Sequence, residues 1–353
     1  MSDTPQPSEA PKVIEAPQSK GLVVPIVIAA VVALAVGLIA GRLIFGAKAS
    51  TQKTAGATVA GTKIDVITKA TQSDFWQSML AGSKDAGVDL GIDIKLTGPT
   101  AETDIDKQVA MVEDSITRKV QAIVLAANSS TALNSVIDRA RAAGIKVITV
   151  DNAVSTTTDG FIGTDNLKAG SKAGERLCKL ITDLGKPDGK VLHESGASGQ
   201  QVLVDRFDGF KAGFTAGCPN ATILATQVND NDLNKAVSQV TDAINANPDL
   251  VGVFADNNTS GTGAARAVAA ISGSKVQVVG FDADPAEVDA IKAGTLQAIV
   301  VQNPYFFGYQ GVVEAAMAVA GRQPPTNLDP GAVVVDAKNV DDPALQSVVR
   351  PPR

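Results

Sequence analysis

The chain has 353 residues, of which 44% are hydrophobic and 19% are charged, and its formal net charge is −6. This length can bury more than one core, and the interspersed acidic and basic residues argue against a nucleic-acid partner, which requires a basic face. One histidine and two cysteines leave little material for a zinc site or a Cys–His pair, so we expect no metal and no cofactor.

The N-terminus carries a polar tail and then an apolar segment. Residues 1–20 are rich in Pro, Ser, Gln and charge, which predicts a disordered tail. Residues 22–41 are uncharged and mostly apolar, long enough to span a bilayer within a helix that we place at 21–46. This helix is either a permanent transmembrane anchor or an export signal cut after Ala49, where Ala47 and Ala49 fit the small-x-small pattern. Its length favours the anchor, and residues 47–61 then form a linker.

Both alternatives place the rest of the chain outside the cytoplasm, anchored to the cell membrane or released as a secreted or periplasmic protein. Arg42 stands where a bacterial lipoprotein would carry its lipidated cysteine, so we expect no lipid anchor. In an exported chain the even pair Cys178 and Cys218 favours a disulfide, with two buried thiols as the alternative. His193 falls within an expected strand without a Ser or Cys partner, so we expect a structural histidine and no enzyme activity.

From Lys63 onward, short β-branched runs alternate with amphipathic stretches. Nine runs are expected to be strands: 64–68, 92–96, 122–125, 147–150, 191–193, 223–226, 252–254, 276–280 and 298–301. Their continuous apolar character is typical of strands buried on both faces of a parallel sheet. Helices are expected at 75–86, 105–118, 132–143 and 235–246, where apolar residues recur three or four apart. The β-α-β order predicts an α/β fold of two doubly wound parallel-sheet lobes, whose strand ends face each other across a ligand cleft.

Motifs in a characteristic order carry a family resemblance over residues 63–340. They are Ser73-Asp74-Phe75-Trp76, the strand Ala143 to Asp151, Gly163-Thr164-Asp165-Asn166, Arg206-Phe207-Asp208-Gly209-Phe210, Val253 to Asn258, Val279-Gly280-Phe281-Asp282 and Val301-Gln302-Asn303-Pro304. With these motifs the chain resembles the ribose-binding, type I periplasmic binding proteins of ABC sugar importers.

This resemblance implies a domain plan. It predicts an N-terminal lobe of 62–163 and 303–334 and a C-terminal lobe of 164–302 and 335–353. Three hinge crossings would join the lobes near Thr164 and Asp165, near Gln302 and Asn303, and near Val335 and Asp336. The expected hinge residues are Thr164, Asp165, Asn303 and Asp336.

The resemblance also implies a function. It predicts a monomer that captures a monosaccharide or polyol between its lobes and delivers it to an ABC transporter permease. The alternative is a sugar-sensing receptor domain that signals to a membrane kinase or chemoreceptor.

A sugar site needs planar side chains that donate and accept hydrogen bonds, together with a flat aromatic surface. The expected ligand-binding residues are Lys69, Ser73, Phe75, Trp76, Asn128, Asp151, Asn152, Asn231, Asn257, Asp282 and Gln302. Several have a structural alternative: core packing for the two aromatics, a turn or helix cap for Asp151, a helix cap for Asn128, Asn257 and Asp282, and a structural hinge role for Gln302.

Four positions depart from the ribose-binding pattern. Lys69 replaces a small hydroxyl or amide residue, and it either points into the cleft, where it can bond ligand oxygens or pair with Asp151, or projects into solvent. Asn152 and Val204 replace arginines, and Asn231 replaces an aromatic residue, while Arg206 is expected to be structural. The loss of two guanidinium groups argues against ribose itself and favours a polyol or a different pentose or hexose.

Overall fold

The computed structural model describes residues 59–353. The predicted tail, the predicted anchor or signal helix at 21–46 and most of the predicted linker lie outside this range. Among the described residues, no helix combines the length and apolar character that a membrane span requires.

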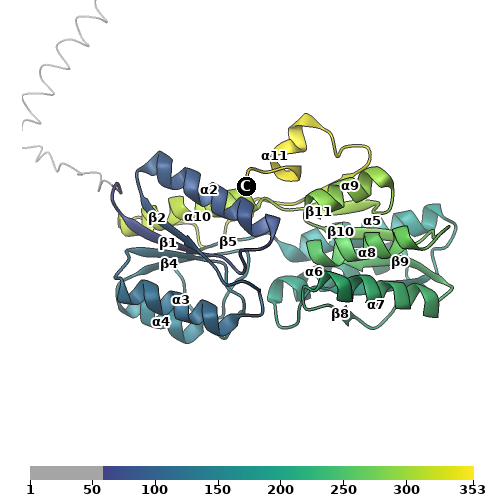
Figure 1. Cartoon of the computed structure of the whole chain (residues 1–353), viewed down its shortest axis with the longest axis horizontal. Coiled ribbons are helices and arrows are strands. Elements are labelled where there is room, and N and C mark those ends of the chain that lie inside the picture. Colours follow the sequence, from purple (N-terminus) through teal and green to yellow (C-terminus); the bar gives the residue numbers. More distant parts are fainter. Residues whose placement is uncertain (1–58) are drawn as a thin grey trace, which may run out of the picture. The chain divides into compact units, whose positions relative to one another are not determined.

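The first lobe is built on a five-stranded, all-parallel sheet in the order β2-β1-β3-β4-β5. Its strands are β1 (Lys63–Ile67), β2 (Asp93–Thr97), β3 (Ala122–Leu125), β4 (Lys146–Val150) and β5 (Gly160–Ile162). Its helices are α2 (Asp74–Leu90), α3 (Ile105–Thr117), α4 (Asn134–Ala142) and α10 (Pro304–Val319). Side chains of α2 and α10 share one apolar core with the sheet, and those of α3 and α4 share a second, so helices cover both faces (Figure 1).

The second lobe holds the sheet β12-β11-β10-β9-β6-β7, with β8 also paired to β6. Its strands are β6 (Lys190–Ser195), β7 (Thr222–Ile223), β8 (Gln227–Val228), β9 (Leu250–Ala255), β10 (Gln277–Phe281), β11 (Ala298–Val301) and β12 (Val333–Asp336). Its helices are α5 (Asn166–Asp183), α6 (Gln201–Gly217), α7 (Leu233–Ala246), α8 (Asn258–Ala270) and α9 (Pro285–Ala293), followed by η1 (Pro343–Leu345) and α11 (Gln346–Val349). Residues of α5 and α6 form one core with the sheet, and those of α7, α8 and α9 form the other.

The strand predictions differ from the structure in three places. The expected strand 223–226 is wrong. In its place this part of the chain forms two short strands that pair with β6, β7 at 222–223 and β8 at 227–228. The three-residue β5 has no run long enough to stand out in the sequence. β12 pairs antiparallel with β11, so the second sheet is not wholly parallel.

Three segments cross between the lobes. The first joins β5 to α5 through Thr164 and Asp165, and the second joins β11 to α10 through Gln302 and Asn303. The third runs from Leu328, which bridges to Ile162 of the first sheet, to β12.

The family resemblance predicts that Asp336 lies at a crossing, but the structure places it within the second sheet. It pairs with Ala298 within the second sheet and accepts a hydrogen bond of 2.8 Å from Arg176. Since β12 begins at Val333, the third crossing ends before the predicted boundary at 334/335.

The second lobe contains the disulfide Cys178–Cys218, which links α5 to the residue that follows α6. The two helices approach closely at Gly170 and Gly209, where a Cβ atom would collide with backbone of the opposite helix. Glycine at these positions and the disulfide together fix α5 against α6.

Candidate functional site

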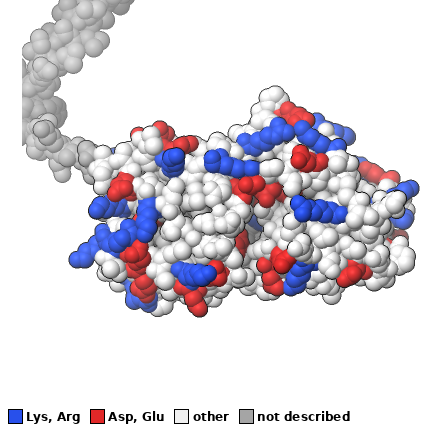
Figure 2. Space-filling view, in the orientation of Figure 1, with Lys and Arg blue, Asp and Glu red and all other residues white. Residues whose placement is uncertain are grey.

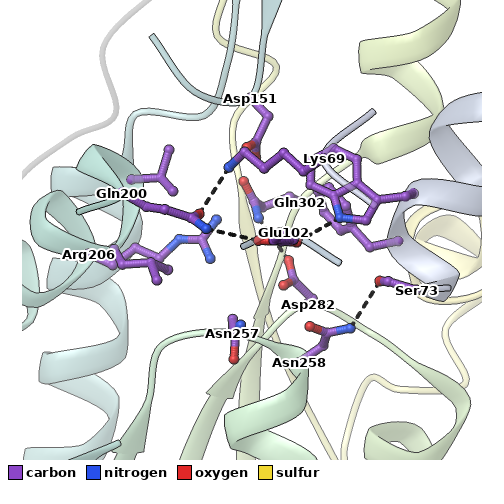
Figure 3. A pocket seen from close by; sticks show the side chains of 14 residues that line it. Lys69, Ser73, Glu102, Asp151, Gln200, Arg206, Asn257, Asn258, Asp282 and Gln302 are labelled. Carbon is purple, nitrogen blue, oxygen red and sulfur yellow. Dashed lines mark hydrogen bonds and ion pairs between the residues drawn. The ribbon is translucent and has the colours of Figure 1, made fainter. Parts of the chain in front are cut away.

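The candidate site is a pocket between the lobes, formed at the carboxyl ends of their strands (Figure 3). Its lining comprises Lys69, Ser73, Phe75, Trp76, Glu102, Asp151, Gln200, Val202, Leu203, Arg206, Asn257, Asn258, Asp282 and Gln302. Eight of the eleven predicted ligand-binding residues are in this set, and Asn128, Asn152 and Asn231 are not.

A buried ion pair dominates the first lobe's half of the pocket. Lys69 follows the end of β1 and Asp151 follows β4, and the Lys69 Nζ lies 2.6 Å from the Asp151 Oδ2. Only 2% of the Lys69 side chain and 5% of the Asp151 side chain is exposed, so the solvent alternative for Lys69 is wrong. Nζ also donates a hydrogen bond of 3.1 Å to Oε1 of Gln200 in the second lobe. Breaking such a pair leaves one buried charge uncompensated, which is costly.

Phe75 and Trp76 form the aromatic wall at the start of α2. Trp76 is 3% exposed and packs in the first lobe's core, so the core-packing alternative holds for it, yet it also lines the pocket. Phe75 meets it edge-on with ring centroids 4.8 Å apart. The indole Nε1 donates a hydrogen bond of 2.8 Å to Oε1 of Glu102, which fixes the ring plane at the pocket.

Asp282 and Gln302 bring buried polar atoms to the pocket from β10 and from the second crossing. Gln302 Nε2 donates a hydrogen bond of 2.8 Å to Oδ1 of Asp282. Gln302 is 2% exposed, and its Oε1 has no hydrogen-bond partner among the described residues. Burial raises the pKa of Asp282, while the positive charge of Arg206 opposes that effect. Asp151 and Asp282 both adopt left-handed backbone, with φ of 63° and 76°, which is uncommon outside glycine and clusters at binding sites.

Asn257 and Arg206 have structural duties as well as pocket-facing positions. Asn257 caps α8, because its Oδ1 accepts a hydrogen bond of 3.0 Å from the Ser260 amide. The capping alternative therefore holds for Asn257, although the residue also lines the pocket. Arg206 donates to Oδ1 of Asn166 and to the carbonyl of Asp256, at 2.9 and 2.8 Å, so its guanidinium group anchors the second lobe.

Three predicted ligand residues lie outside this lining. Asn128 donates a hydrogen bond of 3.2 Å to the Lys69 carbonyl, and Asn152 donates one of 3.1 Å to the Ala127 carbonyl. Both amides thus hold the loops that carry Lys69 and Asp151. Asn231 lines the groove beside the pocket.

Three polar residues of the lining were missed by the sequence reasoning. Glu102 lies in the loop after β2, Gln200 at the N-cap position of α6, and Asn258 at the start of α8. Asn258 Nδ2 lies 3.4 Å from the Ser73 Oγ across the cleft. Both Glu102 and Gln200 lie in loops at carboxyl ends of parallel strands, which is a signal for a site residue, but each lies five residues beyond the end of its strand.

His193 is buried away from the pocket. Its Nε2 lies 3.2 Å from Oδ2 of Asp256 and its Nδ1 2.9 Å from Oγ1 of Thr226, and its ring stacks on Phe207 with centroids 3.8 Å apart. Ser195 donates to the same Asp256 oxygen, so the serine and the histidine meet at the carboxylate and do not bond each other. These groups form a structural network beneath the second lobe's strand ends. Within residues 59–353, no cluster of His, Cys, Asp and Glu is arranged to hold a metal ion.

The chain matches the model of one protein family over most of the two lobes. The model of the periplasmic binding protein domain matches residues 64–323, a range that contains the strands of both sheets except β12, and two of the crossings. The chain belongs to this family. Members of this family bind substrates for transport and are not enzymes.

The chain is similar to sugar-binding proteins of known role. The ribose import binding protein of Haemophilus influenzae is 29% identical over 250 residues, which cover 70% of this chain and 82% of that protein. The D-allose-binding periplasmic protein of Escherichia coli is 28% identical over 256 residues, or 70% of this chain and 81% of that protein.

A solved structure gives the corresponding fold. A carbohydrate transporter solute-binding protein from Agrobacterium radiobacter, in complex with D-arabinose, is 33% identical with a TM-score of 0.79, and the match covers 82% of this chain and 99% of that one.

Proposed function

We propose that this chain is the extracytoplasmic substrate-binding component of an ABC importer and captures a neutral monosaccharide or polyol between its lobes. The observation that carries the proposal is the set of fixed, buried hydrogen-bonding groups around one aromatic wall. Asp151, Asp282 and Gln302 offer oxygens that accept hydroxyl protons, and the Trp76 ring offers an apolar face for the C–H groups of a sugar. The relatives named above bind ribose, D-allose and D-arabinose.

Gln302 adds a specific argument for a ligand with hydroxyl donors. A buried amide oxygen without a partner is unfavourable, because its hydrogen bonds to water have been lost. The Gln302 Oε1 is such an atom, and Gln302 lines the pocket. A ligand hydroxyl bonded there would satisfy it, and the closed arrangement of the lobes would gain stability.

Binding would proceed by opening and closing about the three crossings. The lobes contact each other through the hydrogen bonds Lys69–Gln200, Gln200–Glu102 and Ser73–Asn258. A sugar in the pocket would replace part of this network with its own hydroxyls and so stabilise the closed form. A membrane permease would then recognise the closed form and import the solute.

The remaining parts of the proposal concern attachment and assembly. The apolar segment at 21–46 would attach the protein to the membrane as a permanent anchor or direct its export as a signal. The binding unit would act as a monomer, since the described lobes supply both walls of the pocket from one chain.

Isothermal titration calorimetry of the exported protein with D-arabinose, D-fucose, D-allose, D-ribose and acyclic polyols tests the proposal. We expect at least one member to bind with micromolar or tighter affinity, which Asp151→Ala should abolish. As a matched control, Asp208→Asn removes an exposed carboxylate of the second lobe that pairs with Lys211, and it should leave binding unchanged. If no sugar or polyol bound, the proposal would be overturned.

A further inference from the structure

Glu102 is the one carboxylate that contacts polar side chains of both lobes at the pocket. Its Oε1 accepts a hydrogen bond of 2.8 Å from the Trp76 indole, and its Oε2 accepts one of 3.0 Å from Gln200 Nε2. Asn231 Nδ2 lies 3.5 Å from the same Oε2. Figure 3 shows Glu102 between the Gln200 side chain and the aromatic wall.

The partners of Glu102 are neutral. Lys69, the one lysine of the lining, forms its ion pair with Asp151, and Arg206 donates to an amide and a carbonyl oxygen. Across residues 59–353, the ion pairs of the structure do not include Glu102. Its negative charge therefore reaches the pocket without a direct ion pair, and the Lys69 ammonium lies beyond the Gln200 amide that separates the two groups.

The groove beside the pocket strengthens this negative field. Its lining includes Asp74, Glu102, Asp230 and Asp284 and contains no lysine or arginine. Asp74 and Asp230 have partners outside the groove, Arg353 and Lys235, which reduce their effect. In Figure 2, acidic side chains border the hollow between the lobes.

We propose that Glu102 is the specificity-determining residue of the cleft. Glu102 accepts a hydrogen bond from a ligand hydroxyl in place of those from Gln200 and Asn231, and its charge excludes anionic sugars. This inference rests on the proposed function, since it concerns the same pocket. Ionised acceptors form stronger hydrogen bonds with hydroxyl donors than amides do, which favours neutral sugars. An acidic sugar would bring a second negative charge close to Glu102 in a partly desolvated space, where repulsion is strong.

Glu102 also positions Trp76. The hydrogen bond to Nε1 holds the indole ring in one orientation, so the aromatic wall and the acceptor keep a fixed geometry relative to each other. Trp76 is the single tryptophan of the chain, and its emission therefore reports this contact without interference.

The test compares Glu102→Gln with the wild type on a neutral sugar and on its uronate, for example D-galactose and D-galacturonate. Glu102→Gln keeps the shape of the side chain and removes its charge. We expect the affinity for the neutral sugar to fall about fivefold, as a charged acceptor becomes a neutral one. The affinity for the uronate relative to the neutral sugar should rise at least about tenfold. Glu113→Gln, which alters an exposed carboxylate of the same lobe paired with Arg139, should change neither value.

Two outcomes separate the inference from the proposed function. If the wild type bound neutral sugars but Glu102→Gln left the uronate preference unchanged, the inference would be overturned and the proposed function would stand. If the wild type bound no sugar, both would fall. In a second measurement without ligand, Glu102→Ala should shift the Trp76 emission maximum; an unshifted maximum would overturn the positioning role.

Discussion

The two lobes contribute different chemistry to one pocket. The first lobe presents the buried pair Lys69–Asp151 and an aromatic wall, all on short connections from β1 and β4 or at the start of α2. The second lobe presents amides, the Arg206 guanidinium group and Asp282, whose pKa is raised by burial. The first lobe therefore offers a buried ion pair beside an aromatic face, whereas the second offers mainly hydrogen-bonding side chains.

The largest expected effect comes from Asp151→Ala in the first lobe. It leaves the Lys69 ammonium buried without its partner, which should cost about 3–5 kcal/mol of stability and abolish sugar binding. Denaturant unfolding and calorimetry measure the two effects.

A double variant separates binding from folding. Lys69→Met combined with Asp151→Leu removes both charges and should restore part of the stability, because apolar replacement of a buried ion pair is often neutral while a leucine at this left-handed position remains strained. Sugar binding should stay absent. Recovery of binding in the double variant would contradict the role assigned to Asp151.

Removal of the disulfide should affect the second lobe alone. Cys178→Ser combined with Cys218→Ser releases a cross-link between residues 40 apart and should lower the free energy of unfolding by about 2–4 kcal/mol. Sugar affinity should stay within about twofold, since neither cysteine lines the pocket. Lost affinity in a folded variant would show that α5 and α6 set the pocket geometry.

Glu194 of the second lobe should make stability depend on pH. Burial is the main cause that raises its pKa to about 8, and a hydrogen bond from Asn229 opposes the shift. The folded state then holds a proton that the unfolded state releases, so stability is fully present below about pH 4.5 and is lost as the pH rises toward 8. Glu194→Gln should remove this loss, so the stability difference between variant and wild type should grow by at most about 1.4 kcal/mol per pH unit in that window. Parallel stability curves for the two proteins would contradict the buried, protonated Glu194.

A smaller effect on binding than at Asp151 is expected at Asp282. Because burial raises the pKa of Asp282, whereas Asp151 forms a buried ion pair with Lys69, Asp282→Asn should weaken sugar binding only about tenfold, far less than Asp151→Ala. Equal losses at the two positions would remove the distinction between the lobes.

Much of the fold follows from the sequence because the strands of parallel β-α-β units are continuous apolar runs. The runs 122–125 and 298–301 coincide with β3 and β11. The short β5, by contrast, gains its place from pairing with β4, a tertiary contact that no local pattern encodes. The same limit explains Asp336, whose place in the sheet depends on pairing with β11.

The site was predictable where a side chain directly follows a strand, as with Asp151 and Asp282. It was less predictable where long loops fold back, as with Glu102 and Gln200. Asn128 and Asn152 also follow strands, but their amides bond backbone carbonyls of neighbouring loops. Sequence position brings such residues to the correct edge of the sheet, and only packing decides which of them faces the cleft.

The most direct test of two lobes that close on a sugar is a crystal structure of the protein with the best-binding sugar of the panel. We expect the sugar ring between Trp76 and the carboxylates of Asp151 and Asp282, with a hydroxyl bonded to the Gln302 Oε1. A sugar bound elsewhere, with the Gln200–Glu102 hydrogen bond intact across the cleft, would contradict the account.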